Sequence, residues 1–475
     1  MKILVSIPHG ASAGNVLRSG VIGHVLDAQP AAQVVIASPL STDAAFVAEF
    51  TRDRVRFESL PPHRPNGLEG RLLALVQAAY IDSAVTESVR IRRQEAAAKN
   101  TIRWIRAKRL FASAVAPSMV RPSTRYDLSD RFVVHPEAEA LFDGHRPDLY
   151  IASSPGLIFA EVPLLRTAVR RRVRSMAVDP SWDNFTNKLL PVRHVDRLIV
   201  WNDLMRDQAI AFHGYQPGGV RVTGAPHWDL YFRPGTTGTR QAFCRQIGAE
   251  PSRKIVTLTT TPQELYRHHA RVLRVLVAGM QSGAWPDVQI LVRLHPRDDI
   301  RGYDEFRGVP GVIIEKPFRP TAPAGDGLAI DMTAESQRHL ADTLRHSDVI
   351  VNVASTIAIE AGIFDTPVVN VSFDGEAPSE FARSARRYYR FTHYVNVTRH
   401  DAVRVAETPV QLVDHIAHYL ADPSLDREGR RRVVAEQCQF TDGRSAERAA
   451  QAILDELADV TRTTPPCVES LVSSR

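Results

Sequence analysis

Residues 348–371 read DVIVNVASTIAIEAGIFDTPVVNV. An apolar run rich in valine and isoleucine, 348–353, precedes a helix-forming stretch, 356–364, and a second apolar run, 367–371. Near-continuous runs of this kind are typical of parallel strands that are buried on both faces. A strand, a helix and a strand in this order make a βαβ unit. The segment therefore predicts a parallel sheet that is covered by helices.

The same alternation extends along the chain on both sides of this segment. Further strands are expected at 2–7, 33–38, 148–152, 175–178, 197–201, 220–224, 254–259, 288–294 and 312–314. Further helices are expected at 16–25, 263–280, 334–346, 409–420 and 446–457. A chain of 475 residues exceeds what one core usually organises. The pattern therefore predicts an α/β protein of two Rossmann-like, doubly wound domains that face each other across a cleft.

A stretch without strand periodicity, 226–252, separates the two alternations and contains Pro-Gly-Thr-Thr-Gly at 234–238. Residues 66–140 also contain no convincing strand, and predict a helical insertion in the N-terminal domain. We therefore expect an N-terminal, acceptor-side domain over 1–228, a linker over 229–252 and a C-terminal, donor-binding domain over 253–460. Residues 461–475 are expected to be a disordered tail.

Charge and composition narrow the range of possible ligands and locations but do not identify the function. A net charge of +6 suits an anionic ligand, whether a nucleotide, an acidic glycan or a membrane surface. No run approaches the roughly 20 apolar residues of a membrane-spanning helix, and residues 1–8 predict a strand, not a signal peptide. We therefore expect a cytoplasmic protein. Its three widely spaced cysteines are expected to be free thiols, Cys244, Cys438 and Cys467.

Residues 90–109 form a basic segment that carries eight lysines and arginines against one acid, Glu95. Apolar side chains lie among them, so the segment can rest on an anionic membrane or hold an anionic acceptor. In the first case the protein would be peripheral on the inner face of the membrane. The alternative is a solvated basic helix that packs by its apolar side.

Two segments at expected strand ends are candidates for binding a phosphorylated donor. Small residues after strand 348–353 would let a diphosphate approach the backbone, and Ser355 and Thr356 add hydroxyls. Glu360, one turn along, could accept from ribose or sugar hydroxyls. Alternatively, Ser355 caps the helix and Glu360 is solvated. The second segment holds three further candidates, Arg293, His295 and Arg297, which can bind phosphate oxygens or form a solvated turn.

A third segment, 179–188, offers a candidate base. Asp183 neighbours Trp182, and a carboxylate beside an aromatic wall can have a raised pKa and accept a proton. Asp183 is the first candidate, and His9, which follows the first expected strand, is the second. The alternative for Asp183 is an Asx turn organised around Asn184.

Taken together, these segments resemble the GT-B glycosyltransferase superfamily, which has two facing Rossmann-like domains. Within it, the chain resembles bacterial surface-polysaccharide enzymes near the CDP-glycerol glycerophosphotransferases and the capsule sugar transferases. The motifs that carry the resemblance, spread over 180–450, are Ser-Trp-Asp-Asn at 181–184, Val-Thr-Gly-Ala-Pro at 222–226 with Asp229, Leu-His-Pro at 294–296, 354–360 with Pro367, and Asp-Gly-Arg-Ser-Ala-Glu-Arg at 442–448.

The resemblance implies transfer of a sugar from a nucleotide-activated donor to a glycan or lipid-linked acceptor. Asp183 or His9 would deprotonate the acceptor hydroxyl, and the residues after 288–294 and 348–353 would stabilise the leaving diphosphate. We expect no metal, no further cofactor and no nucleic-acid partner.

The chain also departs from its apparent relatives. Glycerophosphotransferases carry a His-Gly-Thr motif where this chain has Trp182-Asp183-Asn184, which favours a different acceptor base and argues against glycerol phosphate transfer. Ala354-Ser355 replaces a glycine-rich turn, and Glu360 lies one residue later than in some relatives. Three alternatives stay open: a nucleotide-sugar epimerase, a polyol-phosphate transferase, and a non-catalytic partner in a polysaccharide-assembly complex.

Overall fold

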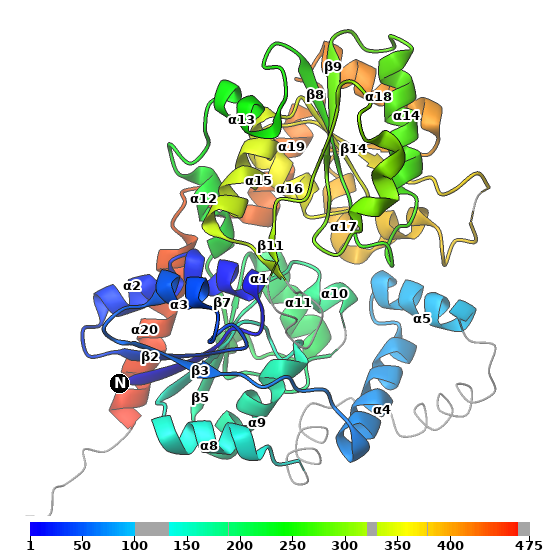
Figure 1. Cartoon of the computed structure of the whole chain (residues 1–475). Helices are drawn as coiled ribbons and strands as arrows, with labels where there is room; N and C mark the ends of the chain where they lie inside the picture. The colour runs from blue at the N-terminus through cyan, green and yellow to red at the C-terminus, as the bar shows by residue number, and fades with distance from the viewer. Residues whose placement is uncertain (100–132, 189, 321–329, 378, 464–475) are drawn as a thin grey trace, which may run out of the picture.

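The computed structural model describes residues 1–99, 133–188, 190–320, 330–377 and 379–463. Its architecture is two α/β domains, each with a parallel sheet between layers of helices (Figure 1). This confirms the predicted pair of Rossmann-like domains. Cys244 and Cys438 are buried free thiols, as expected, and Cys467 lies outside the described residues.

The N-terminal domain is built on a seven-stranded sheet of order β3-β2-β1-β4-β5-β6-β7, in which all neighbours are parallel. Its strands are β1 (Lys2–Ser6), β2 (Gln33–Ser38), β3 (Val55–Ser59), β4 (Leu149–Ala152), β5 (Arg174–Val178), β6 (Arg197–Val200) and β7 (Val220–Val222). The helices are α1 (Gly10–Ala13), α2 (Val21–Ala28), α3 (Ala44–Phe50), α8 (Pro136–His145), α9 (Val162–Arg170) and α11 (Asp203–His213). Sequence reasoning missed β3, because this edge strand is only partly buried and has no continuous apolar run.

The C-terminal domain has a six-stranded parallel sheet of order β10-β9-β8-β13-β14-β15. Its strands are β8 (Lys254–Thr259), β9 (Val288–Arg293), β10 (Val312–Glu315), β13 (Val349–Asn352), β14 (Val368–Val371) and β15 (Arg404–Ala406). The helices are α13 (Arg240–Ile247), α14 (His269–Gln281), α15 (Ala334–His346), α16 (Ile357–Ile363), α17 (Thr392–Thr398), α18 (Pro409–Ala421) and α19 (Arg427–Cys438). Residues 348–371 thus form the predicted βαβ unit, as β13, α16 and β14.

The last helix, α20 (Ser445–Thr463), returns to the N-terminal domain and packs beside α2 (Figure 1). Ala450, Ile453 and Leu457 belong to the same buried apolar cluster as Val5 and Val25. The sequence predicted this helix but assigned it to the C-terminal domain, 253–460. Periodicity shows that a helix has an apolar face, whereas the partner of that face is set by the tertiary fold.

The start of α20 is held in place by α12 (Asp229–Phe232), which lies inside the expected linker. The buried carboxylate of Asp229 accepts hydrogen bonds from the N–H groups of Ser445 (2.9 Å) and Ala446 (2.8 Å). Gly224 has a φ of +90°, and a Cβ on it would lie 2.2 Å from Ser445 Oγ. Two of the motifs behind the resemblance, 222–229 and 442–448, therefore meet at the start of α20.

The helical insertion is confirmed within the described residues by α4 (Gly67–Ser83) and α5 (Glu87–Lys99), while 100–132, with the rest of the basic segment, lie outside them. Helix α5 forms hydrogen bonds with residues of the C-terminal domain. Glu95 accepts from Arg387 Nε (2.6 Å), and Ser88 Oγ accepts from the Thr392 N–H (2.7 Å). The insertion therefore bridges the two domains.

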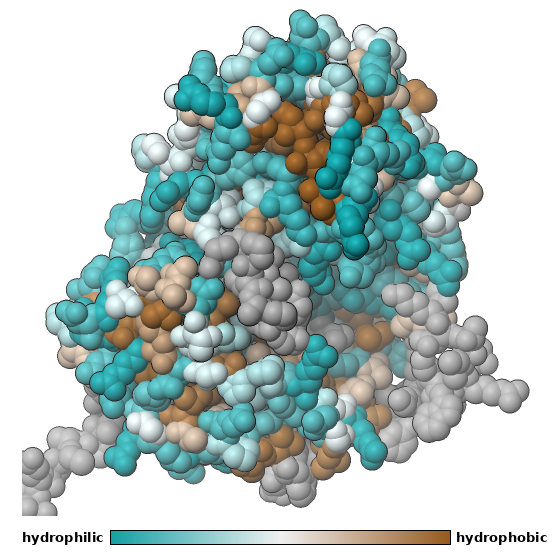
Figure 2. All heavy atoms as spheres, viewed as in Figure 1, coloured by the Kyte–Doolittle hydropathy of each residue, from teal (hydrophilic) through white to brown (hydrophobic). Residues whose placement is uncertain are grey.

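No helix in the described part of the chain is, by itself, long and apolar enough to cross a membrane. α4 and α5 reach that length and hydropathy only as a pair, and the pair is bent by 114°. The face of the molecule in Figure 2 is mostly hydrophilic in the C-terminal domain, apart from one hydrophobic patch, and is of mixed hydropathy in the N-terminal domain.

Candidate active site

The loop after β5 carries Asp183 to the side of the N-terminal domain that meets α17. Asp183 accepts hydrogen bonds from Ser181 Oγ (2.5 Å) and Asn187 Nδ2 (3.2 Å), and Lys188 Nζ lies 3.7 Å from its Oδ2. Burial raises the pKa of Asp183, but Lys188, His393 and these hydrogen bonds outweigh it, so the net shift is downward. The expected raised pKa is therefore wrong for this residue, which is ionised at neutral pH.

The raised pKa belongs to Asp179 instead. Burial raises the pKa of Asp179 to about 8. Its Oδ1 accepts from the Ser181 N–H (2.9 Å) and Asn184 Nδ2 (2.6 Å). The Asx-type turn of this loop is thus organised by Asp179, not by Asn184, and it holds the segment that presents Asp183.

A histidine of the other domain lies next to Asp183. The ring of Trp182 lies 5.0 Å from that of His393 and 5.9 Å from that of Tyr394, both on α17. Burial lowers the pKa of His393 to about 4 while Asp183 acts to raise it, so the imidazole is neutral at pH 7. Its Nδ1 has no hydrogen-bond partner among the described residues. Sequence reasoning missed His393, because it follows neither a strand end nor a recognisable motif.

Two cations complete this cluster. Arg92, on insertion helix α5, donates from Nε to Asn187 Oδ1 (2.8 Å). Arg92 and Lys188 both lower the pKa of His393, which shows that their charges reach it. Arg92, from the basic segment, therefore lies beside the Asp183 loop.

His9 lies at a different position along the same edge of the sheet. Strand β4 separates β1, which leads to His9, from β5, which leads to Asp183. His9 Nδ1 accepts from the Ser12 N–H (3.2 Å) and caps α1. The structure therefore gives His9 a capping contact and does not place it in the Asp183 cluster.

Arg293, at the end of β9, is buried. Its Nη1 donates to Glu315 Oε1 (3.1 Å), and the other oxygen of Glu315 lies 2.8 Å from His339 Nε2. Arg293 Nη2 has no hydrogen-bond partner in the described ranges. A buried guanidinium nitrogen that has no acceptor within the protein can donate a hydrogen bond to a phosphate oxygen.

The other two candidates of this segment differ in exposure. Burial lowers the pKa of His295 to about 4, and its Nδ1 accepts from the Arg297 N–H (3.1 Å). The His295 N–H donates to Thr260 Oγ1 at the end of β8 (2.8 Å). Arg297 is exposed. Arg293 and His295 thus share a strand end, and Arg297 forms the solvated turn that was the alternative.

The turn between β13 and α16 is shaped by Ala354, whose φ of +32° lies in the left-handed region that favours glycine. The hydroxyls of Tyr389 and Tyr394 lie near this turn: Tyr389 donates to the Val371 carbonyl oxygen (2.7 Å), and Tyr394 accepts from Asn370 Nδ2 (2.6 Å). Binding of a diphosphate by the amides of this turn stays a prediction. Ser355 Oγ accepts from the Ile357 N–H (3.3 Å) at the first residue of α16, whereas Thr356, at the N-cap position, makes no side-chain cap hydrogen bond.

Glu360 is buried, so the solvated alternative is wrong. Its Oε2 accepts from the hydroxyl of Tyr231, on α12 (2.7 Å), and burial raises its pKa. Glu360 therefore joins the C-terminal domain to the linker. A contact with ribose stays a prediction.

Tyr394 connects the two halves of the candidate site. Its ring packs against Trp182, and its hydroxyl accepts from Asn370 Nδ2 (2.6 Å) at the end of β14 and lies near Ser355. The loop of Asp183 and the loop of Ser355 therefore both lie beside the same helix, α17.

Residues 160–455 match the family model described as CDP-glycerol:poly(glycerophosphate) glycerophosphotransferase. The match covers well over half of the chain and includes the Asp183 loop, Arg293, the Ser355 turn and α17. The chain belongs to this family. The glycerophosphotransferase family is one of nucleotide-linked transferases of surface-polymer synthesis, as the resemblance implied. No curated protein sequence matches the chain significantly.

Solved structures show the same fold at low identity. The MnaA–UDP complex of S. aureus is 12% identical, with a TM-score of 0.54 and coverage of 98% of this chain and 99% of that one. UDP-GlcNAc 2-epimerase of Neisseria meningitidis is 11% identical, with a TM-score of 0.53 and coverage of 96% and 100%. A variant of the wall teichoic acid polymerase TagF, soaked with CDPG, is 9% identical, with a TM-score of 0.51 and coverage of 97% and 89%. At these identities the likeness shows the GT-B fold alone.

Proposed function

We propose that this glycerophosphotransferase-family chain moves a nucleotide-activated group to a hydroxyl of a surface polymer. The observation that carries the proposal is the family match over 160–455, which contains both the Asp183 loop and the donor-side residues. The position of the Asp183 loop and the Ser355 turn beside the same helix, α17, supports a site formed by both domains. A base on the N-terminal side would receive the acceptor proton, and donor phosphates would lie against Arg293 and His295.

The family description favours a CDP-activated polyol phosphate as the donor. A nucleotide sugar is the second candidate, and Trp182-Asp183-Asn184, in place of a His-Gly-Thr motif, favours it. The two reactions release different products. Transfer of a polyol phosphate from a CDP-polyol breaks the diphosphate bond and leaves CMP, whereas transfer of a sugar leaves the nucleoside diphosphate.

Asp183 is proposed as the acceptor base. In the free protein Lys188 and the hydrogen bonds from Ser181 and Asn187 hold it as the anion, which is the form that can take a proton. A general base is most effective when its pKa lies near the working pH. An anionic acceptor that draws Lys188 toward itself would raise the pKa of Asp183 and bring it closer to that condition.

Lys188→Met should raise the KM for an anionic acceptor by roughly 10- to 100-fold, the worth of one hydrogen bond to a charged group at about 1.5 to 3 kcal/mol, with little change in donor affinity. The control is Lys254→Met. The side chains of Lys188 and Lys254 are 46% and 50% exposed, and each pairs with an aspartate, but Lys254 begins β8 at the opposite edge of the sheet from the donor-side residues. Steady-state kinetics with varied acceptor measure both variants. Equal KM values for Lys188→Met and the control would remove Lys188 from the acceptor site.

The donor class is tested by thermal stabilisation with a panel of CDP-polyols and UDP-, GDP- and CDP-sugars. A ligand that binds only the native state stabilises it by about 2.7 kcal/mol at 100 times its Kd. One nucleotide class should raise the Tm in a concentration-dependent way, and Arg293→Gln should remove the effect. No stabilisation by any of them would contradict the proposal.

A further inference from the structure

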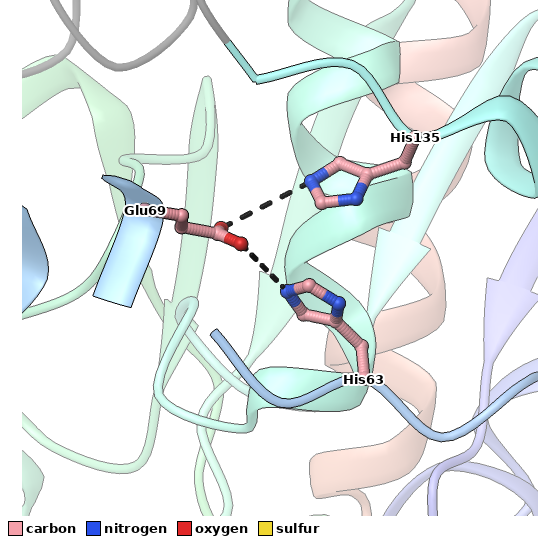
Figure 3. Close-up of side chains that lie close together, drawn as sticks. All are labelled: His63, Glu69 and His135. Atoms are coloured by element: carbon pink, nitrogen blue, oxygen red, sulfur yellow. Dashed lines mark ion pairs between the residues drawn. The ribbon is translucent and has the colours of Figure 1, made fainter. Parts of the chain in front are cut away.

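Three side chains of the kind that bind metal ions meet at the base of the insertion. His63 lies between β3 and α4, Glu69 in the first turn of α4, and His135 immediately before α8. Their ligand atoms all lie within 4.8 Å of one another. Figure 3 shows the carboxylate of Glu69 pointing toward both imidazoles, with His63 Nε2 3.1 Å and His135 Nε2 4.0 Å from its oxygens.

Contacts with Glu69 hold this cluster together, but among the described residues they leave the two imidazole Nε2 atoms without hydrogen bonds of ordinary geometry. The Nε2 atoms of His63 and His135 are buried, and neither has a hydrogen-bond partner among the described residues. The 3.1 Å approach of His63 to Glu69 is short enough for a hydrogen bond but does not have its direction. Buried polar atoms without partners are costly and rare. Two such nitrogens aimed at one carboxylate therefore point to a missing ligand.

The donor set matches a divalent transition metal. Two imidazole nitrogens and one carboxylate oxygen are ligands that suit zinc and its first-row neighbours. Ligands 2.0–2.1 Å from a tetrahedral zinc ion lie roughly 3.3 Å apart, so only small side-chain movements are required.

The surroundings also fit such an ion. Arg166 Nη1 lies 3.2 Å from Glu69 Oε1 and can orient the carboxylate while Oε2 faces the imidazoles. A cavity of about 220 Å³, with both histidines in its wall, gives room for a water molecule as the fourth ligand.

We propose that His63, Glu69 and His135 bind one divalent first-row transition-metal ion. His63 and Glu69 flank the start of the insertion and His135 lies near its end, so the ion fastens the two ends of the insertion to each other. None of the three residues belongs to the cluster around Asp183. The proposal is therefore independent of the transferase reaction, for which we expect no metal.

Zinc binding to the chelator-treated full-length protein tests the site. Isothermal titration should show one tight equivalent of Zn²⁺, and that equivalent should raise the Tm. His63→Ala and His135→Ala should each weaken this binding by more than the roughly 10- to 100-fold that loss of an outer-shell partner costs. Cobalt, added in place of zinc, should give the visible absorption of a four- or five-coordinate ion.

The chain contains 17 histidines, so adventitious binding requires a control. His24→Ala, on α2, removes a histidine outside the cluster and should bind zinc as the wild type does. With chelator present, the two cluster variants should unfold at the wild-type temperature or above it, and only the gain from zinc should be lost. A wild-type protein without a tight equivalent, or cluster variants that keep it, would overturn the proposal.

Discussion

Asp183→Asn should lower turnover by roughly 10²- to 10⁴-fold, the usual worth of a positioned general base. Asparagine keeps the size of the side chain and the acceptor for Ser181 Oγ, so the loop should hold its shape. Donor affinity should barely change, because the donor-side residues lie on the other domain. Turnover is measured as nucleotide released per enzyme, and donor affinity by calorimetry.

The matched variant is His9→Asn, because asparagine also caps helices and should preserve the cap of α1. The structure predicts near-normal turnover for His9→Asn, since His9 does not lie in the Asp183 cluster. A larger loss for His9→Asn than for Asp183→Asn would reverse the two assignments. Normal turnover in both would move the search for the base to His295.

Asp229→Ala should lower the free energy of unfolding by at least about 3 kcal/mol. The substitution removes a charged acceptor that receives two hydrogen bonds, each worth about 1.5 to 3 kcal/mol. Both bonds hold the first turn of α20 on the N-terminal domain. The loss should appear as a lower Tm and as faster hydrogen exchange in α20.

Thr239→Ala is the control for this effect. Thr239 caps α13 through the Ala242 N–H (3.2 Å), within the C-terminal domain. Its removal should cost about 1 kcal/mol and leave exchange in α20 unchanged. If Asp229→Ala left the protection of α20 intact, the helix would be held by its apolar face alone.

The sheets could be predicted because their strands are buried on both faces and read as apolar runs, as 348–353 and 367–371 do. In the two parallel sheets, the strands that sequence reasoning missed, β3 and β15, are both at sheet edges. β3 alternates polar and apolar residues, and β15 is three residues long. The destination of α20 could not be predicted, because an amphipathic helix does not reveal which sheet it will cover.

The candidate site was predictable only in part. Asp183, Arg293 and the Ser355 turn were chosen as candidates because ligands of parallel sheets bind beyond the carboxyl ends of strands, and their roles stay predictions. His393 was not predicted, because it lies on a helix of the other domain and comes close to Asp183 only in the folded structure. The direction of the pKa shift of Asp183 was missed for a different reason. The sequence showed Lys188 nearby, but not that its charge and the hydrogen bonds from Ser181 and Asn187 would outweigh burial.

The central claim is that the chain transfers a nucleotide-activated group to a hydroxyl acceptor. It is tested most directly by following the nucleotide and the transferred group together, with the donor that stabilises the protein, in the presence and absence of a hydroxyl-bearing polymer. The account predicts release of CMP or nucleoside diphosphate in equal amount to the group transferred, and only when the acceptor is present. A donor that is isomerised without acceptor would indicate an epimerase, and a donor that binds but is never consumed would indicate a non-catalytic partner; either result would contradict the account.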